Sequence, residues 1–232
     1  TEGLAPAWGH DAHTTMLLGA AKVLSRHKEA YTGKIKFVFQ PNEEGYAEPD
    51  HPVNRMAMEK GYKPLAPDAG MGGAGFMIQQ GVMDGVDACV ALHVQPNLPF
   101  GTAYIAKKEA CASTDMMKIT IQGKGGHGSL PQNAIDPVPA MTELIQSLYI
   151  LPTREADGAE KWVFHIGNVY TPGSIWSAVA DKAVIEMGYR AFNDETRALF
   201  TRRTRELAEL ISAANRCTVS IDHSVGYRPT TN

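Results

Sequence analysis

The order of the periodic segments in the second half of the chain most constrains its fold. Four segments have strand-like composition or alternation, and two have apolar residues at helical spacing. In chain order they are strand 116–122, a helix opened by Asp136-Pro137, strands 162–169 and 180–189, helix 194–214 and strand 218–225. This is the β-α-β-β-α-β order of the ferredoxin-like split βαβ arrangement. We therefore predict an independent two-layer α+β domain.

The first half of the chain has the pattern of part of an α/β unit. A helix with Asp11 as its N-cap is expected to run through Leu24, and a strand is expected over 34–39. Further along, a helix begins at Ala74 and ends near Gly81, and an apolar strand is expected over 88–94. Between these pairs, residues 46–72 are rich in Pro, Gly and charge, which predicts a long surface excursion.

Composition excludes several classes of protein. With 232 residues and 44% hydrophobic residues, the chain can bury the core of one large domain or two modest ones. A net charge of -3 provides no basic face for nucleic acid, and no apolar run is long enough to span a membrane. Three cysteines without CxxC spacing fit free thiols in a reducing compartment, so we predict a cytoplasmic protein. The chain starts at Thr1 without a signal segment, as expected for a piece of a longer protein.

Two adjacent carboxylates, Glu43 and Glu44, follow the expected strand 34–39, and Pro41 stops its ladder from continuing. The carboxyl end of a strand is where ligands bind in open α/β sheets. Neighbouring residues on an extended chain point in different directions, so one carboxylate could hold a metal while the other moves a proton. The alternative is a solvated acidic turn.

Two histidines provide further metal-capable atoms. His10 lies at the entrance of the first helix and His93 near the end of strand 88–94. With Glu44 they are three potential ligands that a parallel sheet could bring to one edge, with Glu43 as general base beside them. Alternatively, His10 is a capping residue and His93 is a hydrogen-bonded core histidine.

The second half of the chain contains two further candidates. His127 lies in the loop 123–128, which is expected to be very flexible and whose glycines would let backbone and imidazole approach a ligand closely. The alternative is an exposed flexible hairpin. Arg190 ends an interior strand, where it could clamp a substrate carboxylate or pair with an acid such as Glu186.

Several motifs together resemble those of the M20 metallopeptidases, in order and approximate spacing. They are Gly-His-Asp-Ala-His-Thr at 9–14, Gln-Pro-Asn-Glu-Glu-Gly at 40–45, Ala-Leu-His at 91–93, and Gly-Gly-His-Gly at 125–128 with Asp-Pro at 136–137. The chain most resembles the amidohydrolase branch, which cleaves N-acyl and aromatic-acid conjugates of amino acids. The resemblance implies a partial metallopeptidase-like α/β catalytic domain (1–111), a lid and dimerisation domain (112–225), and the start of a return to the catalytic domain (226–232).

The resemblance also implies roles for individual residues. His10, Glu44 and His93 correspond to metal ligands, and Glu43 corresponds to the catalytic base. His127 corresponds to a lid histidine that reaches a neighbouring subunit's site and stabilises the oxyanion. The implied protein is a homodimeric, metal-dependent hydrolase of a C–N bond, amide or aryl amine, in a small carboxylate-bearing substrate, including aromatic ones.

The sequence departs from the family's pattern in three places. Trp8 stands where the branch has a cysteine ligand, which favours one manganese or zinc ion per site. Ser177 stands for a lid asparagine, so we expect it to contact substrate differently. The closing segment with a last histidine ligand is absent from the chain, which ends at Asn232. The chain is then either a fragment whose companion fragments complete the enzyme, or a non-catalytic M20-like binding and dimerisation protein.

Overall fold

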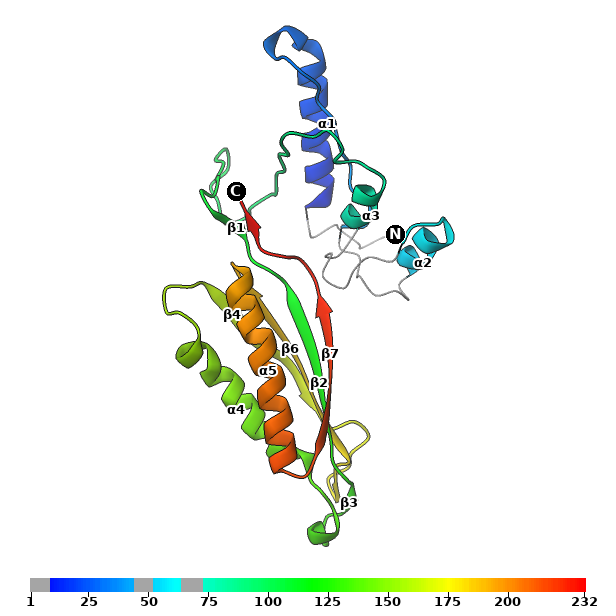
Figure 1. The fold of residues 1–232 in the computed structure, drawn as a ribbon, viewed down its shortest axis with the longest axis vertical. Helices are drawn as coiled ribbons and strands as arrows, with labels where there is room; N and C mark the ends of the chain where they lie inside the picture. The colour runs from blue at the N-terminus through cyan, green and yellow to red at the C-terminus, as the bar shows by residue number, and fades with distance from the viewer. Residues whose placement is uncertain (1–8, 44–51, 64–72) are drawn as a thin grey trace. The chain divides into compact units, whose positions relative to one another are not determined.

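The computed structural model describes residues 9–43, 52–63 and 73–232 (Figure 1). These residues fall into two compact units: 9–43 with 73–105, here the first unit, and 52–63 with 106–232, the second unit. The helices are α1 (His10–Arg26), η1 (Lys28–Ala30), α2 (Pro52–Glu59), α3 (Ala74–Gln79), η2 (Pro131–Asn133), α4 (Pro137–Glu155) and α5 (Asp194–Ala214). The strands are β1 (Glu109–Cys111), β2 (Asp115–Gln122), β3 (Gly126–His127), β4 (Trp162–Tyr170), β5 (Ala178–Val179), β6 (Lys182–Ala191), β7 (Thr218–Val225) and β8 (Thr230–Thr231).

The second unit is built on a four-stranded antiparallel sheet with the strand order β4-β6-β2-β7. Helices α4 and α5 pack on the sheet and on each other (Figure 1). The chain order of these elements is β2-α4-β4-β6-α5-β7, so the predicted β-α-β-β-α-β order is confirmed. Two short pairs, β1 with β8 and β3 with β5, lie outside this sheet and were not predicted.

Alternating burial along β2 shows why these residues form a sheet with one covered face. Met117, Ile119 and Ile121 are buried, whereas the residues between them are exposed or half-buried. The buried side chains belong to the same core as Leu144 of α4 and Phe200 of α5. Each fully buried side chain of this size contributes about 1.5–3 kcal/mol relative to an exposed one.

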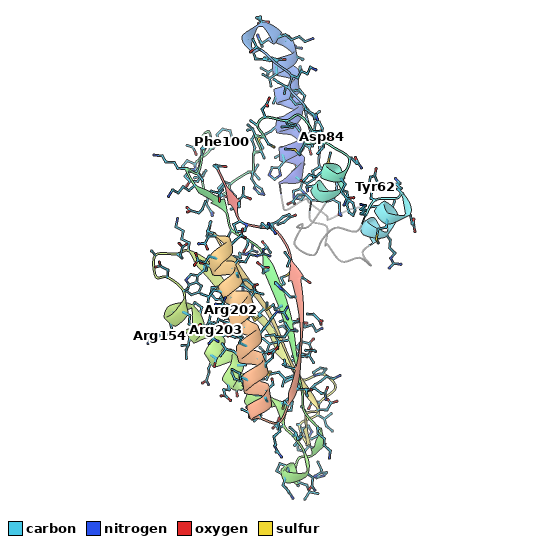
Figure 2. All side chains as sticks on the ribbon, viewed as in Figure 1. Tyr62, Asp84, Phe100, Arg154, Arg202 and Arg203 are labelled. Atoms are coloured by element: carbon cyan, nitrogen blue, oxygen red, sulfur yellow. The ribbon has the colours of Figure 1, made fainter. Side chains whose placement is uncertain are left out.

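A side-chain cap stabilises the start of α4, and an ion pair joins α4 to α5. Asp136 caps α4 by accepting a hydrogen bond from the Val138 N–H at 2.9 Å, as the Asp-Pro sequence predicted. Arg203 of α5, labelled in Figure 2, donates to both carboxylate oxygens of Glu155 at the end of α4, at 2.5 and 2.9 Å. This bidentate pair joins the two helices on their exposed side.

A buried ionic network joins α5 to the sheet. Asp115 of β2 is 1% exposed and accepts two hydrogen bonds from Arg197 of α5, at 2.7 and 2.8 Å. His223 of β7 lies 3.0 Å from the same carboxylate. Burial alone would raise the pKa of Asp115, but hydrogen bonds from Arg197 and His223, and their charges, outweigh burial and lower the pKa. The carboxylate is therefore held in its charged form.

In the first unit, α1 is confirmed as a helix, but its predicted N-cap is wrong. The helix begins at His10, and Gly9 occupies the N-cap position with a φ of 81°. Glycine adopts this left-handed conformation without the steric cost of a β-carbon. Asp11 lies inside the first turn, where its negative charge still interacts favourably with the helix dipole. Helix α3 was also predicted correctly.

The two strands predicted in the first unit are not formed. Residues 34–39 and 88–94 have no strand assignment, and within 9–43 and 73–105 the backbone forms no strand ladder. Val90 is 91% exposed, which is inconsistent with a buried strand. An apolar segment becomes a strand only when another segment pairs with it, and the described residues of this unit supply no such segment.

Three further expectations concern the rest of the chain. Helix α2 lies inside the excursion expected over 46–72, whereas residues 44–51 and 64–72 lie outside the described part. Cys89, Cys111 and Cys217 are free thiols, as predicted. Within the described ranges, no helix has the length and apolar character needed to cross a membrane.

Candidate metal-binding and catalytic site

The first unit brings His10 and Glu43 into contact. His10 is the first residue of α1, and Glu43 follows a turn in which Asn42 has a φ of 50°. The His10 Nε2 and Glu43 Oε2 atoms are 3.3 Å apart, and both side chains are about two-fifths exposed, at 39% and 42%. The carboxylate therefore lies beside the first turn of a helix, where the helix dipole favours negative charge.

His93 is held in one tautomer by its own segment of the chain. Its Nδ1 atom is 2.7 Å from the Val94 carbonyl oxygen. Because a carbonyl only accepts hydrogen bonds, Nδ1 carries the proton in this contact, and in the neutral imidazole Nε2 then carries the lone pair. Histidines that bind metals are commonly oriented by such a bond from the second ring nitrogen.

His13 lies beside both of these histidines, a role that the sequence interpretation missed. Its ring centroid is 4.4 Å from that of His93 and 5.7 Å from that of His10. Burial, followed by the charges of His93 and His10, lowers the pKa of His13, so its imidazole is favoured in the neutral form. The available signal was the spacing of three residues from His10, which places both side chains on one face of α1.

Two predicted residues, Glu44 and Trp8, lie outside the described part of the chain. Among residues 9–43, 52–63 and 73–232, no group of three His, Cys, Asp or Glu side chains is arranged to hold a metal. Of the predicted ligands, His10 and His93 lie in the described part, and both are imidazoles of the first unit. This donor chemistry fits a divalent ion such as zinc or manganese.

In the second unit, a short ribbon brings His127 and Ser177 together. Strand β3 pairs with β5, so that His127 lies opposite Ala178. The Gly128 N–H donates to the Ser177 carbonyl at 3.0 Å. His127 Nδ1 accepts from the Ser129 N–H at 3.1 Å, which leaves the exposed imidazole with Nε2–H as its donor.

The expectation that the glycines of 123–128 form a very flexible loop is wrong. A β-carbon on Gly128 would lie 2.6 Å from the Ser177 carbonyl oxygen, and one on Gly126 would lie 3.0 Å from the β-carbon of Ala134. A β-carbon on Gly123 would overlap the Ile135 carbonyl oxygen. None of these glycines has a positive φ. They are needed for the close approach of neighbouring segments.

We expect Gly128→Ala to destabilise the β3–β5 ribbon by about 1–3 kcal/mol, the usual range for overpacking. The added methyl group would meet a backbone oxygen, which cannot rotate away as a flexible side chain can. Native-state hydrogen exchange of the Gly128 amide measures the effect. Gly158→Ala is the matched control, because a β-carbon there meets nothing within 4 Å. Equal protection of the Gly128 amide in wild type and Gly128→Ala would contradict the packing argument.

Arg190 does not pair with Glu186, the alternative that the sequence suggested. Its Nη1 donates to Thr114 Oγ1 at 2.9 Å, whereas Glu186 lies 3.5 Å from Lys118 Nζ and accepts from Tyr170 at 3.1 Å. Arg190 is near the end of β6 opposite Lys182, which follows the last residue of β5 by three positions. Within this unit, Arg190 and His127 are therefore not brought together.

Comparison with known protein families identifies the family of this chain. The model of peptidase family M20/M25/M40 matches residues 1–232. This chain belongs to that family. The M20 assignment agrees with the resemblance carried by the motifs around His10, Glu43, His93 and His127.

The curated relatives include proteins named as a deacetylase and as hydrolases. The chain is 32% identical over 231 residues to an N-acetyl-L-cysteine deacetylase of Bacillus subtilis, covering 100% of this chain and 49% of the relative. It is 33% identical over 223 residues to the IAA-amino acid hydrolase ILR1-like 4 of Arabidopsis thaliana (96% and 45%). It is 32% identical over 227 residues to a hippurate hydrolase of Campylobacter jejuni (97% and 52%). The chain thus spans about half the length of these relatives.

Solved structures agree with this assignment. A candidate aminohydrolase from methicillin-resistant Staphylococcus aureus matches with a TM-score of 0.79 at 28% identity, covering 100% of this chain and 53% of that one. A dinuclear metal-binding M20 peptidase of Bacillus subtilis matches with a TM-score of 0.70 at 26% identity, covering 100% and 52%. The mixed helix and sheet architecture is therefore that of M20 enzymes.

Proposed function

We propose that this chain is the part of a metal-dependent amidohydrolase that carries its catalytic base and several of its metal ligands. The substrate class is a small carboxylate-bearing molecule with an amide or aryl-amine C–N bond, including N-acyl and aromatic conjugates of amino acids. The contact of 3.3 Å between His10 Nε2 and Glu43 Oε2 carries this proposal, because it joins a metal-capable imidazole to a proton acceptor. The names of the deacetylase, IAA-amino acid hydrolase and hippurate hydrolase relatives support the substrate class.

In this proposal, His10, Glu44 and His93 hold a divalent metal. When bound, the metal supplies Lewis acidity and lowers the pKa of water in the site. Glu43 accepts the proton of the attacking water and then delivers it to the leaving nitrogen. The lone pair on His93 Nε2, which its Nδ1 bond to Val94 leaves available, supports its role as a ligand.

Residues 112–225 of the second unit are proposed to form a ferredoxin-like lid and dimerisation domain. The His127 Nε2–H would donate to the oxyanion that develops in the site of a neighbouring subunit. The Ser129 bond to Nδ1 supports this, because it leaves Nε2 protonated without requiring a positive charge. Ser177, whose backbone bonds to that of Gly128, is proposed to contact substrate beside His127. Arg190 remains a candidate clamp for a substrate carboxylate.

The metal is proposed to be manganese or zinc, with one ion per site because Trp8 replaces a cysteine ligand of the branch. The Bacillus subtilis M20 peptidase is described as dinuclear, so a two-metal centre is the competing arrangement. Free thiols at Cys89 and Cys111, both exposed, support the cytoplasm as the proposed location.

The experiment that tests this function combines metal analysis with a substrate screen on the complete polypeptide. We expect about one tightly bound manganese or zinc ion per subunit and hydrolysis of N-acetyl, benzoyl or indole-acetyl amino acids. Chelation should remove the turnover, and the same metal should restore it, whereas a sample dialysed without chelator should stay active. A metal-replete protein that binds no metal and releases no amine would instead support a non-catalytic binding and dimerisation protein.

A further inference from the structure

We infer that His13 is a positioning residue that holds the backbone of Val94 and thereby fixes the tautomer in which His93 presents its Nε2 lone pair. This role deepens the proposed function, on which its relevance to metal binding rests. Its geometric part depends only on contacts within the first unit.

A long-range hydrogen bond joins His13 to Val94. The Val94 N–H donates to His13 Nε2 at 3.1 Å, across 81 positions of sequence. Because a backbone N–H can only donate, His13 Nε2 is the unprotonated nitrogen of the ring and His13 is neutral. That nitrogen is occupied by Val94, so His13 holds the backbone instead of offering this lone pair to a metal.

A second hydrogen bond joins Val94 to His93. The Val94 carbonyl oxygen accepts the His93 Nδ1–H at 2.7 Å. Val94 is therefore held at both backbone polar groups, its N–H by His13 and its carbonyl by His93. If the Val94 N–H lost its partner, the backbone could rotate and the His93 Nδ1–H would lose a fixed acceptor.

Close packing at the start of α1 supports the same arrangement independently. A β-carbon on Gly9 would overlap the Cγ2 atom of Val94. Val94 thus packs directly against the turn that enters α1, one helical turn before His13. The side chain and the N–H of Val94 contact the same end of the helix, which places Val94 and the adjacent His93 near the start of α1.

The chemical consequence concerns the nitrogen that His93 presents. A histidine binds a metal only through an unprotonated ring nitrogen, and the bond at its other nitrogen decides which one that is. Loss of such an orienting contact typically weakens metal binding about 10–100-fold. The ring centroids of His13 and His93 are also 4.4 Å apart, so the His13 ring restricts the orientation of the His93 imidazole.

The test compares His13→Gln with His13→Asn in the whole chain. Both are neutral amides, but only the glutamine oxygen extends about as far as His13 Nε2 and can accept from Val94. Nitrogen-15 NMR of the metal-free chain reports the His93 tautomer, and hydrogen exchange reports protection of the Val94 amide. We expect His13→Gln to retain both signatures and His13→Asn to lose them, while the amides of α1 stay protected in each variant.

A titration of the complete polypeptide with Zn²⁺ alone provides the second readout. We expect His13→Asn to bind zinc about 10–100-fold more weakly than wild type and His13→Gln to bind close to wild type. Retention of the His93 Nδ1–H tautomer and of zinc affinity in His13→Asn would overturn the inference, and so would equal losses in both variants. If wild type binds no zinc, the proposed function fails at this site, and the metal-free NMR comparison still decides whether His13 positions His93.

Discussion

Replacing Glu43 by glutamine in the complete enzyme is expected to lower kcat about 10²–10⁴-fold, the usual contribution of a general base. Glutamine has nearly the same shape and can still contact His10, whose Nε2 lies 3.3 Å from the Glu43 carboxylate. It cannot accept a proton at this position, so the attacking water would have to lose its proton to solvent. Steady-state kinetics on an N-acyl amino acid, with metal analysis of the same sample, measure both consequences.

Glu29→Gln is the matched control for this variant. Glu29 is an exposed acid of η1 in the same unit, 3.4 Å from His27 Nδ1, and its replacement removes the same charge. We expect its kcat and metal content to equal those of wild type. Wild-type turnover in Glu43→Gln would show that Glu43 is not the base. Loss of the metal from Glu43→Gln would make Glu43 a ligand instead.

The sequence predicts the second unit well because each of its main helices and strands has a recognisable pattern within its own segment of the chain. Alternation along 116–122 identifies β2, and Asp136-Pro137 marks the start of α4 through a cap and a fixed proline φ. The long amphipathic segment 194–214 coincides with α5. Each of these signals is contained within about 20 residues, and each is consistent with the sheet that the strands form together.

The sequence could not predict features that depend on partners distant along the chain. The segments 34–39 and 88–94 have strand composition, yet the described first unit contains no segment that pairs with them. The bond of His13 to Val94 spans 81 positions, so no local pattern indicates it. The loop around His127 was interpreted as flexible because glycine composition does not distinguish freedom from close packing.

Replacing Asp115 is also expected to have a large effect, in this case on the stability of the second unit. We expect Asp115→Asn to lower the free energy of unfolding by about 3–5 kcal/mol, because it leaves the Arg197 guanidinium buried without its counter-charge. Asp115 is fully buried and the Arg197 side chain is only 13% exposed, so water cannot replace the lost carboxylate. Urea denaturation of the whole chain, with hydrogen exchange of β2 and β6 amides, measures the loss.

Two further variants separate charge from shape. Asp222→Asn removes a carboxylate from the exposed face of neighbouring β7 and should cost less than about 1 kcal/mol. Combining Asp115→Asn with Arg197→Met removes the uncompensated charge, so the double variant should be more stable than the sum of the two single losses predicts. Additive losses would show that the two side chains act independently and would refute the buried-pair explanation.

The dependence of stability on pH provides a test of the charge itself. The pKa of Asp115 is lowered in the folded protein, so its contribution is complete above the ordinary aspartate pKa of about 3.9. That contribution is lost as the pH falls through the lower pKa of the folded state. The difference in unfolding free energy between wild type and Asp115→Asn should therefore shrink as the pH falls below about pH 4. A difference that stayed constant to the lowest measurable pH would mean that Asp115 stabilises α5 through hydrogen bonding alone, because only the ionised carboxylate can neutralise Arg197.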